Sequence, residues 1–193
     1  MHVSLVENPC DEKDMVIGVT GSFGSGKTTV ARMFAKLGAY YIDADRVYHS
    51  LLRHDSAMRK KIIKHFGETV TMSAGKIDTK KLAKIVFSDR AKLDLLNRLT
   101  HPAIKNKIKD MIRAEKTRDI VLEAPLLIES RFYREADIVI VIEGREKEDA
   151  LMRTRMQMPL NKKLAFADFI IDNSGTREKT FSQVREIWKK RGE

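Results

Sequence analysis

Residues 15–38 read MVIGVTGSFGSGKTTVARMFAKLG, and this stretch decides the fold. Its first six residues form a short apolar run, which predicts a buried strand. From Lys27 onward the apolar residues follow a helical spacing, and Gly38 is typical of the position just after a helix. Between strand and helix, residues 21–28 satisfy the pattern G-x-x-x-x-G-K-[ST]. Strand, glycine-rich loop and helix therefore follow one another in order.

This order of elements predicts a phosphate-binding loop at residues 21–28. Its glycines allow the backbone to wrap closely around phosphate oxygens, and the helix N-terminus adds a partial positive charge. Lys27 can then reach the β- and γ-phosphates, and the Thr28 hydroxyl can bind Mg²⁺. A chance match in an ordinary strand-to-helix loop is the alternative, but the surrounding strand and helix disfavour it.

Four further apolar runs predict buried strands, at residues 39–42, 120–122, 138–142 and 169–171. Helical spacings separate them, and Pro102 should start or kink a helix. Such alternation predicts an α/β fold in which helices cover both faces of a parallel five-stranded sheet. The lysine-rich region from about residue 46 to 89 breaks the alternation and is interpreted as a helical insertion.

Composition and charge limit the function classes. The chain has 193 residues, of which 42% are hydrophobic and 33% charged, which is typical of one globular domain. We find neither a run of about 18 apolar residues nor a signal-peptide pattern, so a cytoplasmic location and no membrane partner are expected. The net charge of +10 favours an anionic partner. Because the basic residues are scattered with few interleaved aromatics, we favour a phosphorylated small molecule over nucleic acid.

Two aspartates follow the second predicted strand, at positions 43 and 45. Ligands of open α/β sheets bind at the carboxyl ends of the strands, so either carboxylate could orient or deprotonate an acceptor hydroxyl. The alternative is a turn or a helix N-cap, which aspartate also favours. The loop alone therefore leaves two classes open: a kinase with a small acceptor, or an NTPase that couples hydrolysis to binding a macromolecule.

Several sequence blocks together resemble the dephospho-coenzyme A kinase family. The opening stretch IGVTGSFGSGKTTVARMFAKLGAYYIDADRV is similar to the start of that family. The similarity continues through HFGETV, KIDTKKLAKIVFSD, LNRLTHPAIKNKI, VLEAPLLIES and QMPLNKKLAFADFIIDNSG, and it covers nearly the whole chain after residue 15. The order and combination of these blocks are more specific than any one of them.

On the acceptor side, the resemblance implies that Asp45 is the catalytic base on the ribose 3′-hydroxyl of dephospho-coenzyme A. Asp43 would support it, and His101 would be an acceptor-side residue, although a packing role is the alternative for a helix-terminal histidine. Thr20 would border the phosphates. The lysine-rich insertion and the His-Pro helix favour this acceptor over the nucleosides and nucleotides of related kinases.

On the nucleotide side, the resemblance implies that ATP is held by residues 24–29. These are Gly24, Ser25, Gly26, Lys27, Thr28 and Thr29. Asn173 and Gly175 belong to a loop that would lie against the adenine, although Asp-Asn-Ser-Gly is also an ordinary turn composition. Glu123 would act with Thr28 on Mg²⁺; alternatively, it only orders the loop before Pro125.

The sequence departs from the family after the strand at residues 138–142. About a dozen residues that the family carries at this junction are absent, in the region expected to close over the phosphates as a lid. Arg145, Arg153 and Arg155 remain as lid candidates, and we favour Arg153 as catalytic because arginines stabilise charge on a transferring phosphoryl group. They could instead pair with nearby acidic residues on a solvated helical face.

The sequence as a whole predicts a three-layer P-loop kinase domain over residues 15–193, preceded by an extension at 1–14. Its core would comprise 15–45 and 90–193, with the acceptor-binding insertion at about 46–89 and a short lid at about 143–163. The predicted reaction is ATP-dependent phosphorylation of dephospho-coenzyme A, with Mg²⁺ as cofactor, by a monomer or weak homo-oligomer. A nucleoside or nucleotide kinase is the alternative, followed by a nucleotide switch that binds nucleic acid.

Overall fold

The computed structural model describes residues 15–72, 75–144 and 157–191. Five strands form one parallel sheet, in the order β2-β3-β1-β4-β5. They are β1 (Val16–Gly21), β2 (Tyr40–Asp43), β3 (Ile120–Glu123), β4 (Ile138–Glu143) and β5 (Phe169–Asp172). The predicted α/β class and all five predicted strands are confirmed, each within one or two residues of its expected ends.

The order of the strands places the phosphate-binding loop at the centre of the sheet. β1 pairs in parallel with both β3 and β4, and β2 lies beyond β3. The chain therefore crosses to one side of β1 to form β2 and β3, and then to the other side to form β4 and β5. The carboxyl ends of β1 and β3 lie side by side where this direction reverses, which is where open α/β sheets bind ligands.

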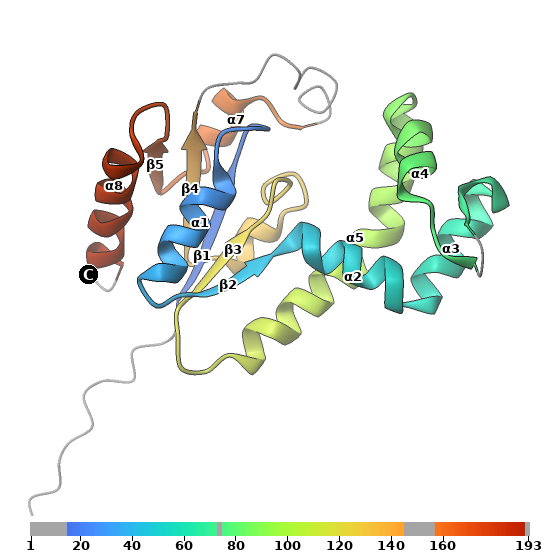
Figure 1. The fold of residues 1–193 in the computed structure, drawn as a ribbon, viewed down its shortest axis with the longest axis horizontal. Helices are drawn as coiled ribbons and strands as arrows, with labels where there is room; N and C mark the ends of the chain where they lie inside the picture. Colours follow the sequence, from blue (N-terminus) through green and yellow to red (C-terminus); the bar gives the residue numbers. More distant parts are fainter. Residues whose placement is uncertain (1–14, 73–74, 145–156, 192–193) are drawn as a thin grey trace, which may run out of the picture.

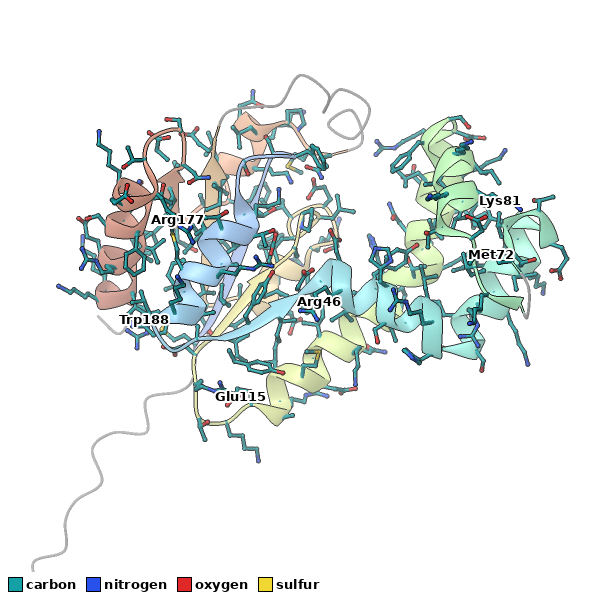
Figure 2. All side chains as sticks on the ribbon, viewed as in Figure 1. Arg46, Met72, Lys81, Glu115, Arg177 and Trp188 are labelled. Carbon is teal, nitrogen blue, oxygen red and sulfur yellow. The ribbon has the colours of Figure 1, made fainter. Side chains whose placement is uncertain are left out.

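Helices cover both faces of the sheet, as its apolar strands require. On one face lie α1 (Lys27–Lys36) and α8 (Arg177–Lys190), which share a buried core with β1, β3 and β4. Phe34 of α1 and Trp188 of α8 pack with their ring centroids 6.2 Å apart, and Figure 2 shows Trp188 at this edge of the molecule. The opposite face is covered by part of α5 (Arg90–Ala114), by α7 (Leu160–Leu164) and by the short helix η3 (Phe132–Glu135).

A separate group of helices extends from the sheet beyond the end of β2 (Figure 1). It contains α2 (Ala44–His54), α3 (Ser56–Phe66), η1 (Glu68–Val70), α4 (Thr79–Phe87) and the start of α5 (Arg90–Ala114). These helices bury a hydrophobic cluster of their own, which includes Ile62, Leu82 and Leu96. We call this group the helical layer.

The helix α5 belongs to both parts of the molecule. Leu96 near its beginning packs in the helical layer, whereas Ile108 packs against the sheet. The expectation that Pro102 starts a helix is wrong, because α5 is a single element of 25 residues with Pro102 inside it. The alternative of a kink agrees with the bend of α5 in Figure 1, since proline removes a hydrogen bond from the helix. Among the described helices, none is long and apolar enough to cross a membrane.

Candidate active site

The phosphate-binding loop has the backbone that its glycines allow. Gly24 and Gly26 have φ angles of 81° and 90°, in the left-handed region that favours glycine. Gly26 is the N-cap of α1, so the loop leads directly into the N-terminus of that helix. Lys27 is buried, and its Nζ donates a hydrogen bond of 2.6 Å to the Ser22 carbonyl. The lysine is thereby folded over its own loop, in position to meet phosphate oxygens.

The Lys27 ammonium is surrounded by groups that act on its charge. Burial is the main cause that lowers the pKa of Lys27 to about 8, and the positive charge of Lys163 lowers it further. Glu123 and Asp45 act in the opposite direction. A bound phosphate would bring negative charge to this ammonium and favour its protonated form.

Asn173 holds the loop from the far end of the chain. Its Nδ2 donates to the Ser25 carbonyl at 2.9 Å, and its Oδ1 accepts from the Thr180 hydroxyl at 2.9 Å. A Cβ placed on Gly26 would lie 2.0 Å from Asn173 Nδ2, so only glycine fits there. The structure therefore places Asn173 against the loop backbone, a contact that the sequence did not predict. Gly175 lies in the exposed turn that follows.

Glu123 lies at the end of β3, where both of its carboxylate oxygens accept hydrogen bonds. Thr28 Oγ1 donates to Glu123 Oε1 at 2.6 Å, and the Tyr41 hydroxyl donates a short bond to Glu123 Oε2. Burial and the bond to Glu123 raise the pKa of Tyr41 and keep it protonated. Thr28 donates its proton to Glu123 and keeps its lone pairs available, which suits Mg²⁺, a cation that prefers oxygen ligands and phosphates.

No group of three or more His, Cys, Asp or Glu side chains that could hold a metal is found within the described ranges. Mg²⁺ usually binds through one or two protein oxygens together with substrate phosphates, so a dedicated cage is not required. The oxygens of Thr28 and Glu123 beside the phosphate-binding loop therefore fit this cation.

The two predicted aspartates differ in position. Asp43 is the N-cap of α2, and its Oδ1 accepts from the Arg46 backbone N–H at 3.0 Å, as in the N-cap alternative. Asp45 lies in the first turn of α2, and its carboxylate faces an open cavity. Burial of this carboxylate among protein groups raises its pKa, and the negative charges of Asp43 and Glu123 add to the effect.

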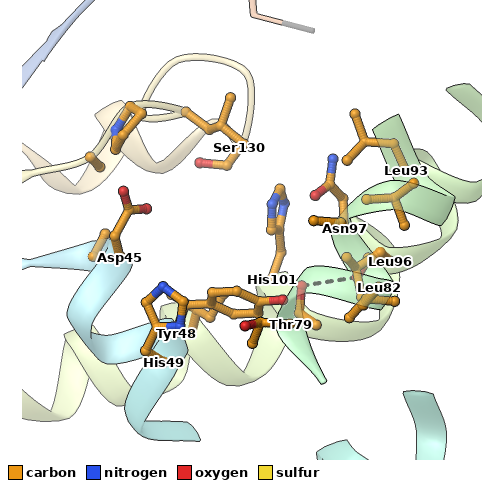
Figure 3. Close-up of a pocket in the computed structure, with 18 of the residues that line it drawn as sticks. Asp45, Tyr48, His49, Thr79, Leu82, Leu93, Leu96, Asn97, His101 and Ser130 are labelled. Carbon is orange, nitrogen blue, oxygen red and sulfur yellow. Dashed lines mark hydrogen bonds between the residues drawn. The ribbon is translucent and has the colours of Figure 1, made fainter. Parts of the chain in front are cut away.

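Two cavities meet at Asp45. The larger, of about 1030 Å³, is lined by the phosphate-binding loop, including Gly24, Gly26, Lys27 and Thr28. The smaller, of about 520 Å³, lies between α2, α4, α5 and the loop after β3 (Figure 3). Asp45 and His101 line both cavities. A nucleotide on the loop and an acceptor in the smaller cavity would therefore meet beside these two side chains.

The walls of the smaller cavity combine an apolar lining with a few polar groups. Leu82, Leu93 and Leu96 line it, and Figure 3 shows Asp45, Asn97 and His101 directed toward its open centre. Burial and the charge of Lys105 lower the pKa of His101, so its imidazole is neutral near pH 7 and can donate or accept a hydrogen bond. Such a site suits a large acceptor with both apolar and polar parts.

Thr20 and Thr29 do not line either cavity. Thr20 is fully buried, and its hydroxyl donates to the Pro125 carbonyl at 3.3 Å. Thr29 lies on the first turn of α1, outside the lining of both cavities. Arg153 and the other lid arginines, Arg145 and Arg155, lie outside the described residues.

The dephospho-CoA kinase family model matches residues 15–179. The chain belongs to the dephospho-CoA kinase family. A dephospho-CoA kinase from Aquifex aeolicus is 40% identical over 187 residues, with 89% of this chain and 95% of the relative covered. One from Carboxydothermus hydrogenoformans is 38% identical over 192 residues, with 91% and 93% covered. The resemblance stated from the sequence is confirmed.

Solved structures of similar fold agree with this family. A dephospho-CoA kinase from Campylobacter jejuni has a TM-score of 0.71 at 27% identity, with 92% of this chain and 96% of that chain covered. TT1252 from Thermus thermophilus has a TM-score of 0.78 at 24% identity, with 93% and 98% covered, and shows the fold alone. The predicted P-loop kinase fold is confirmed, and family membership supports dephospho-CoA kinase over the nucleoside kinase and nucleotide-switch alternatives.

Proposed function

We propose that this chain transfers the γ-phosphoryl group of ATP to the ribose 3′-hydroxyl of dephospho-CoA, giving ADP and CoA. Family membership supports the reaction class and the acceptor. The observation that carries the proposal is the position of Asp45, which lines both the cavity of the phosphate-binding loop and the neighbouring cavity of the helical layer. Of the residues that the structure describes, Asp45 is the only carboxylate that lines both cavities, so it can meet both the acceptor and the γ-phosphate.

The residues have distinct roles in this proposal. The 3′-oxygen forms a bond to the γ-phosphorus while the bond between that phosphorus and the β,γ-bridging oxygen breaks, and the hydroxyl proton passes to the Asp45 carboxylate. Asp45 is suited to accept this proton because its pKa is raised. Lys27 and the loop N–H groups stabilise negative charge that moves onto ADP.

Mg²⁺ would be held by Thr28 and Glu123 and would neutralise charge on the β- and γ-phosphates. Tyr41 holds the second oxygen of Glu123 and so limits rotation of that carboxylate. His101 lines the acceptor side as a neutral hydrogen-bonding group. A monomeric or weakly associating state and a cytoplasmic location remain predictions from the sequence.

The test is an acceptor panel. The purified chain is incubated with ATP and Mg²⁺, alone or with dephospho-CoA, adenosine or AMP, and ADP release is followed while mass spectrometry identifies the product. We expect stimulation by dephospho-CoA alone, with a product one phosphoryl group heavier. If dephospho-CoA gives no stimulation over background hydrolysis, the proposal fails. A chelator should stop the reaction, and added Mg²⁺ should restore it.

A further inference from the structure

Lys163 is a buried cation without a role in the mechanism above. It lies on α7, and its side chain is 0% exposed. A buried ammonium is costly unless it is paired and hydrogen-bonded. Lys163 Nζ donates to the Pro125 carbonyl at 2.7 Å and lies 3.1 Å from Glu129 Oε1, so the cost is offset by one carbonyl and one carboxylate.

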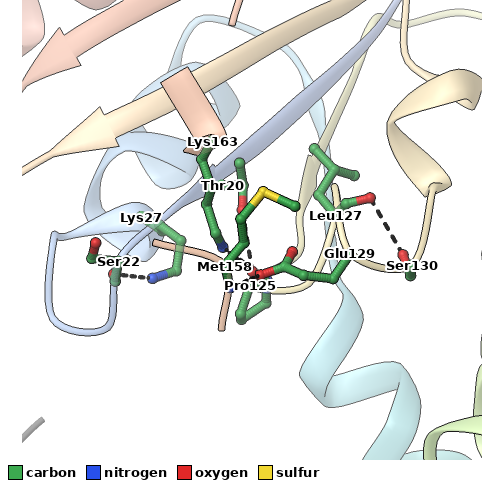
Figure 4. A network of polar contacts seen from close by, with 9 residues as sticks. All are labelled: Thr20, Ser22, Lys27, Pro125, Leu127, Glu129, Ser130, Met158 and Lys163. Atoms are coloured by element: carbon green, nitrogen blue, oxygen red, sulfur yellow. Dashed lines mark hydrogen bonds and ion pairs between the residues drawn. The ribbon is translucent and has the colours of Figure 1, made fainter. Parts of the chain in front are cut away.

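These contacts join three segments around the active site (Figure 4). The Pro125 carbonyl also accepts from Thr20, the residue before the phosphate-binding loop. Glu129 Oε1 also accepts from the Met158 backbone N–H at 2.8 Å. Lys163 therefore connects the end of β1, the loop after β3 and the segment that leads into α7.

The same cluster faces the larger cavity. Pro125, Glu129 and Gln157 line it together with Lys27. Within the described part of the chain, Glu129 Oε2 and Gln157 Oε1 are buried and lack a hydrogen-bond partner. Buried acceptors are nearly always satisfied, so exceptions at a cavity wall are places where a water, an ion or a ligand can supply the partner. This cluster therefore forms part of the wall of the cavity that contains the phosphate-binding loop.

The charge of Lys163 also acts on the phosphate-binding lysine. Lys163 is second only to burial among the causes that lower the pKa of Lys27. The negative charge of a triphosphate beside Lys27 would offset this repulsion between the two ammonium groups. A methionine at position 163 could occupy similar space but would supply no charge.

We propose that Lys163 is a positioning residue for phosphoryl transfer, which fixes the loop at residues 125–129 beside the phosphate site and adds a second buried positive charge next to Lys27. This inference rests on the proposed function. It predicts that catalysis depends on the positive charge at position 163 itself and not on the ion pair as a structural unit.

Four variants separate these two roles: Lys163→Met, Lys163→Arg, Glu129→Gln and the double variant Lys163→Met/Glu129→Gln. Glutamine keeps an acceptor oxygen for the Met158 N–H and removes the charge. Lys162→Met is the matched control, because Lys162 is exposed on the same helix. For each variant, kcat and KM for ATP and for dephospho-CoA are measured, together with Tm.

We expect Lys163→Met to lower kcat by about a hundredfold, as when a preorganised group beside a reacting phosphate is removed, with KM for dephospho-CoA within about threefold. The double variant should regain Tm because it removes the unpaired carboxylate, yet keep the low kcat. Lys163→Arg should retain most of kcat, and Glu129→Gln should lose less than Lys163→Met.

Two results would overturn the inference. Either Lys163→Met retains kcat within about threefold of the wild type, or the double variant recovers kcat along with Tm, which would make the pair structural. The proposed function is judged separately, by the wild type and Lys162→Met. If these two proteins do not phosphorylate dephospho-CoA, the proposed function fails, and the role of Lys163 is tested by the affinity for ADP instead. Equal ADP affinity in Lys163→Met and the wild type would contradict that role.

Discussion

The phosphate-binding loop at residues 21–28 depends on the backbone conformation of its glycines, whereas the smaller cavity is lined by residues of α2, α4 and α5. The loop needs particular φ angles at Gly24 and Gly26, and these leave a direct mark on the sequence. The cavity needs only apolar side chains of suitable size, which many sequences supply. The nucleotide side is therefore specified by conformation, and the acceptor side by shape.

Asp45 lines both cavities, so we expect its replacement to have the largest effect of the substitutions considered. Replacing it with asparagine keeps its size but removes the proton acceptor, so we expect kcat to fall by about a thousandfold. Affinity for ADP, measured by calorimetry, should change less than about threefold. Asp110→Asn, at an exposed position of α5, is the control. Retained turnover in Asp45→Asn would exclude it as the base.

Gly26→Ala tests whether nucleotide binding depends on the backbone conformation of the phosphate-binding loop. The added Cβ would collide with Asn173 Nδ2, and alanine is strained at a φ of 90°. We expect ADP affinity to fall by about a hundredfold, equivalent to about 3 kcal/mol. Gly75→Ala is the matched control, since Gly75 also has a positive φ, of 65°, but nothing lies within 4 Å of its added Cβ. Equal effects of the two substitutions on ADP affinity would contradict the role given to Asn173.

Ala83→Trp tests whether acceptor binding depends on the shape of the smaller cavity. Ala83 of α4 lines the smaller cavity, and an indole there should occupy part of the acceptor volume. We expect KM for dephospho-CoA to rise about thirtyfold, within the 1–3 kcal/mol typical of overpacking, while KM for ATP stays within about twofold. Ala91→Trp, at an exposed position of α5, controls for the surface effect of tryptophan. A parallel rise in both KM values would mean that the two cavities are not separable.

In the pH dependence of activity, we expect the fall at low pH to report Asp45 and the fall at high pH to report Lys27. Asp45 acts deprotonated and its pKa is raised, so activity should fall with decreasing pH sooner than for an ordinary aspartate. Lys27 acts protonated, and because its pKa is lowered to about 8, kcat/KM for ATP should fall about tenfold for each pH unit above that value. At saturating ATP the alkaline fall should move to higher pH, since bound phosphate favours the ammonium. An alkaline limb that ATP does not move would exclude Lys27 as its source.

The sequence predicted the fold well because its signals are local. The apolar runs that became β1 to β5 and the pattern at residues 21–28 each lie within a few neighbouring positions. Asp45 could also be placed, because it follows a strand end directly. Such features follow from backbone geometry and burial, which nearby residues decide.

The remaining parts of the site depend on contacts between distant residues. Lys163 is separated from Pro125 by 38 positions, and Asn173 from Ser25 by 148. In the sequence, Lys163 is one lysine among many, and nothing near it shows that it is buried. Tyr41 was assigned only to an apolar strand, although its hydroxyl reaches Glu123. Of the two roles predicted for Pro102, the helix start is wrong because α5 continues through this residue and packs on both sides of it.

The hydrogen bond from Asn173 to Ser25 also bears on how the protein is made. Synthesis proceeds from the N-terminus, so residues 21–28 leave the ribosome long before position 173 is translated. The hydrogen bond to the Ser25 carbonyl cannot form until β5 and the turn that carries Asn173 have emerged. The phosphate-binding loop therefore gains this support only late in translation, long after its own residues have been made.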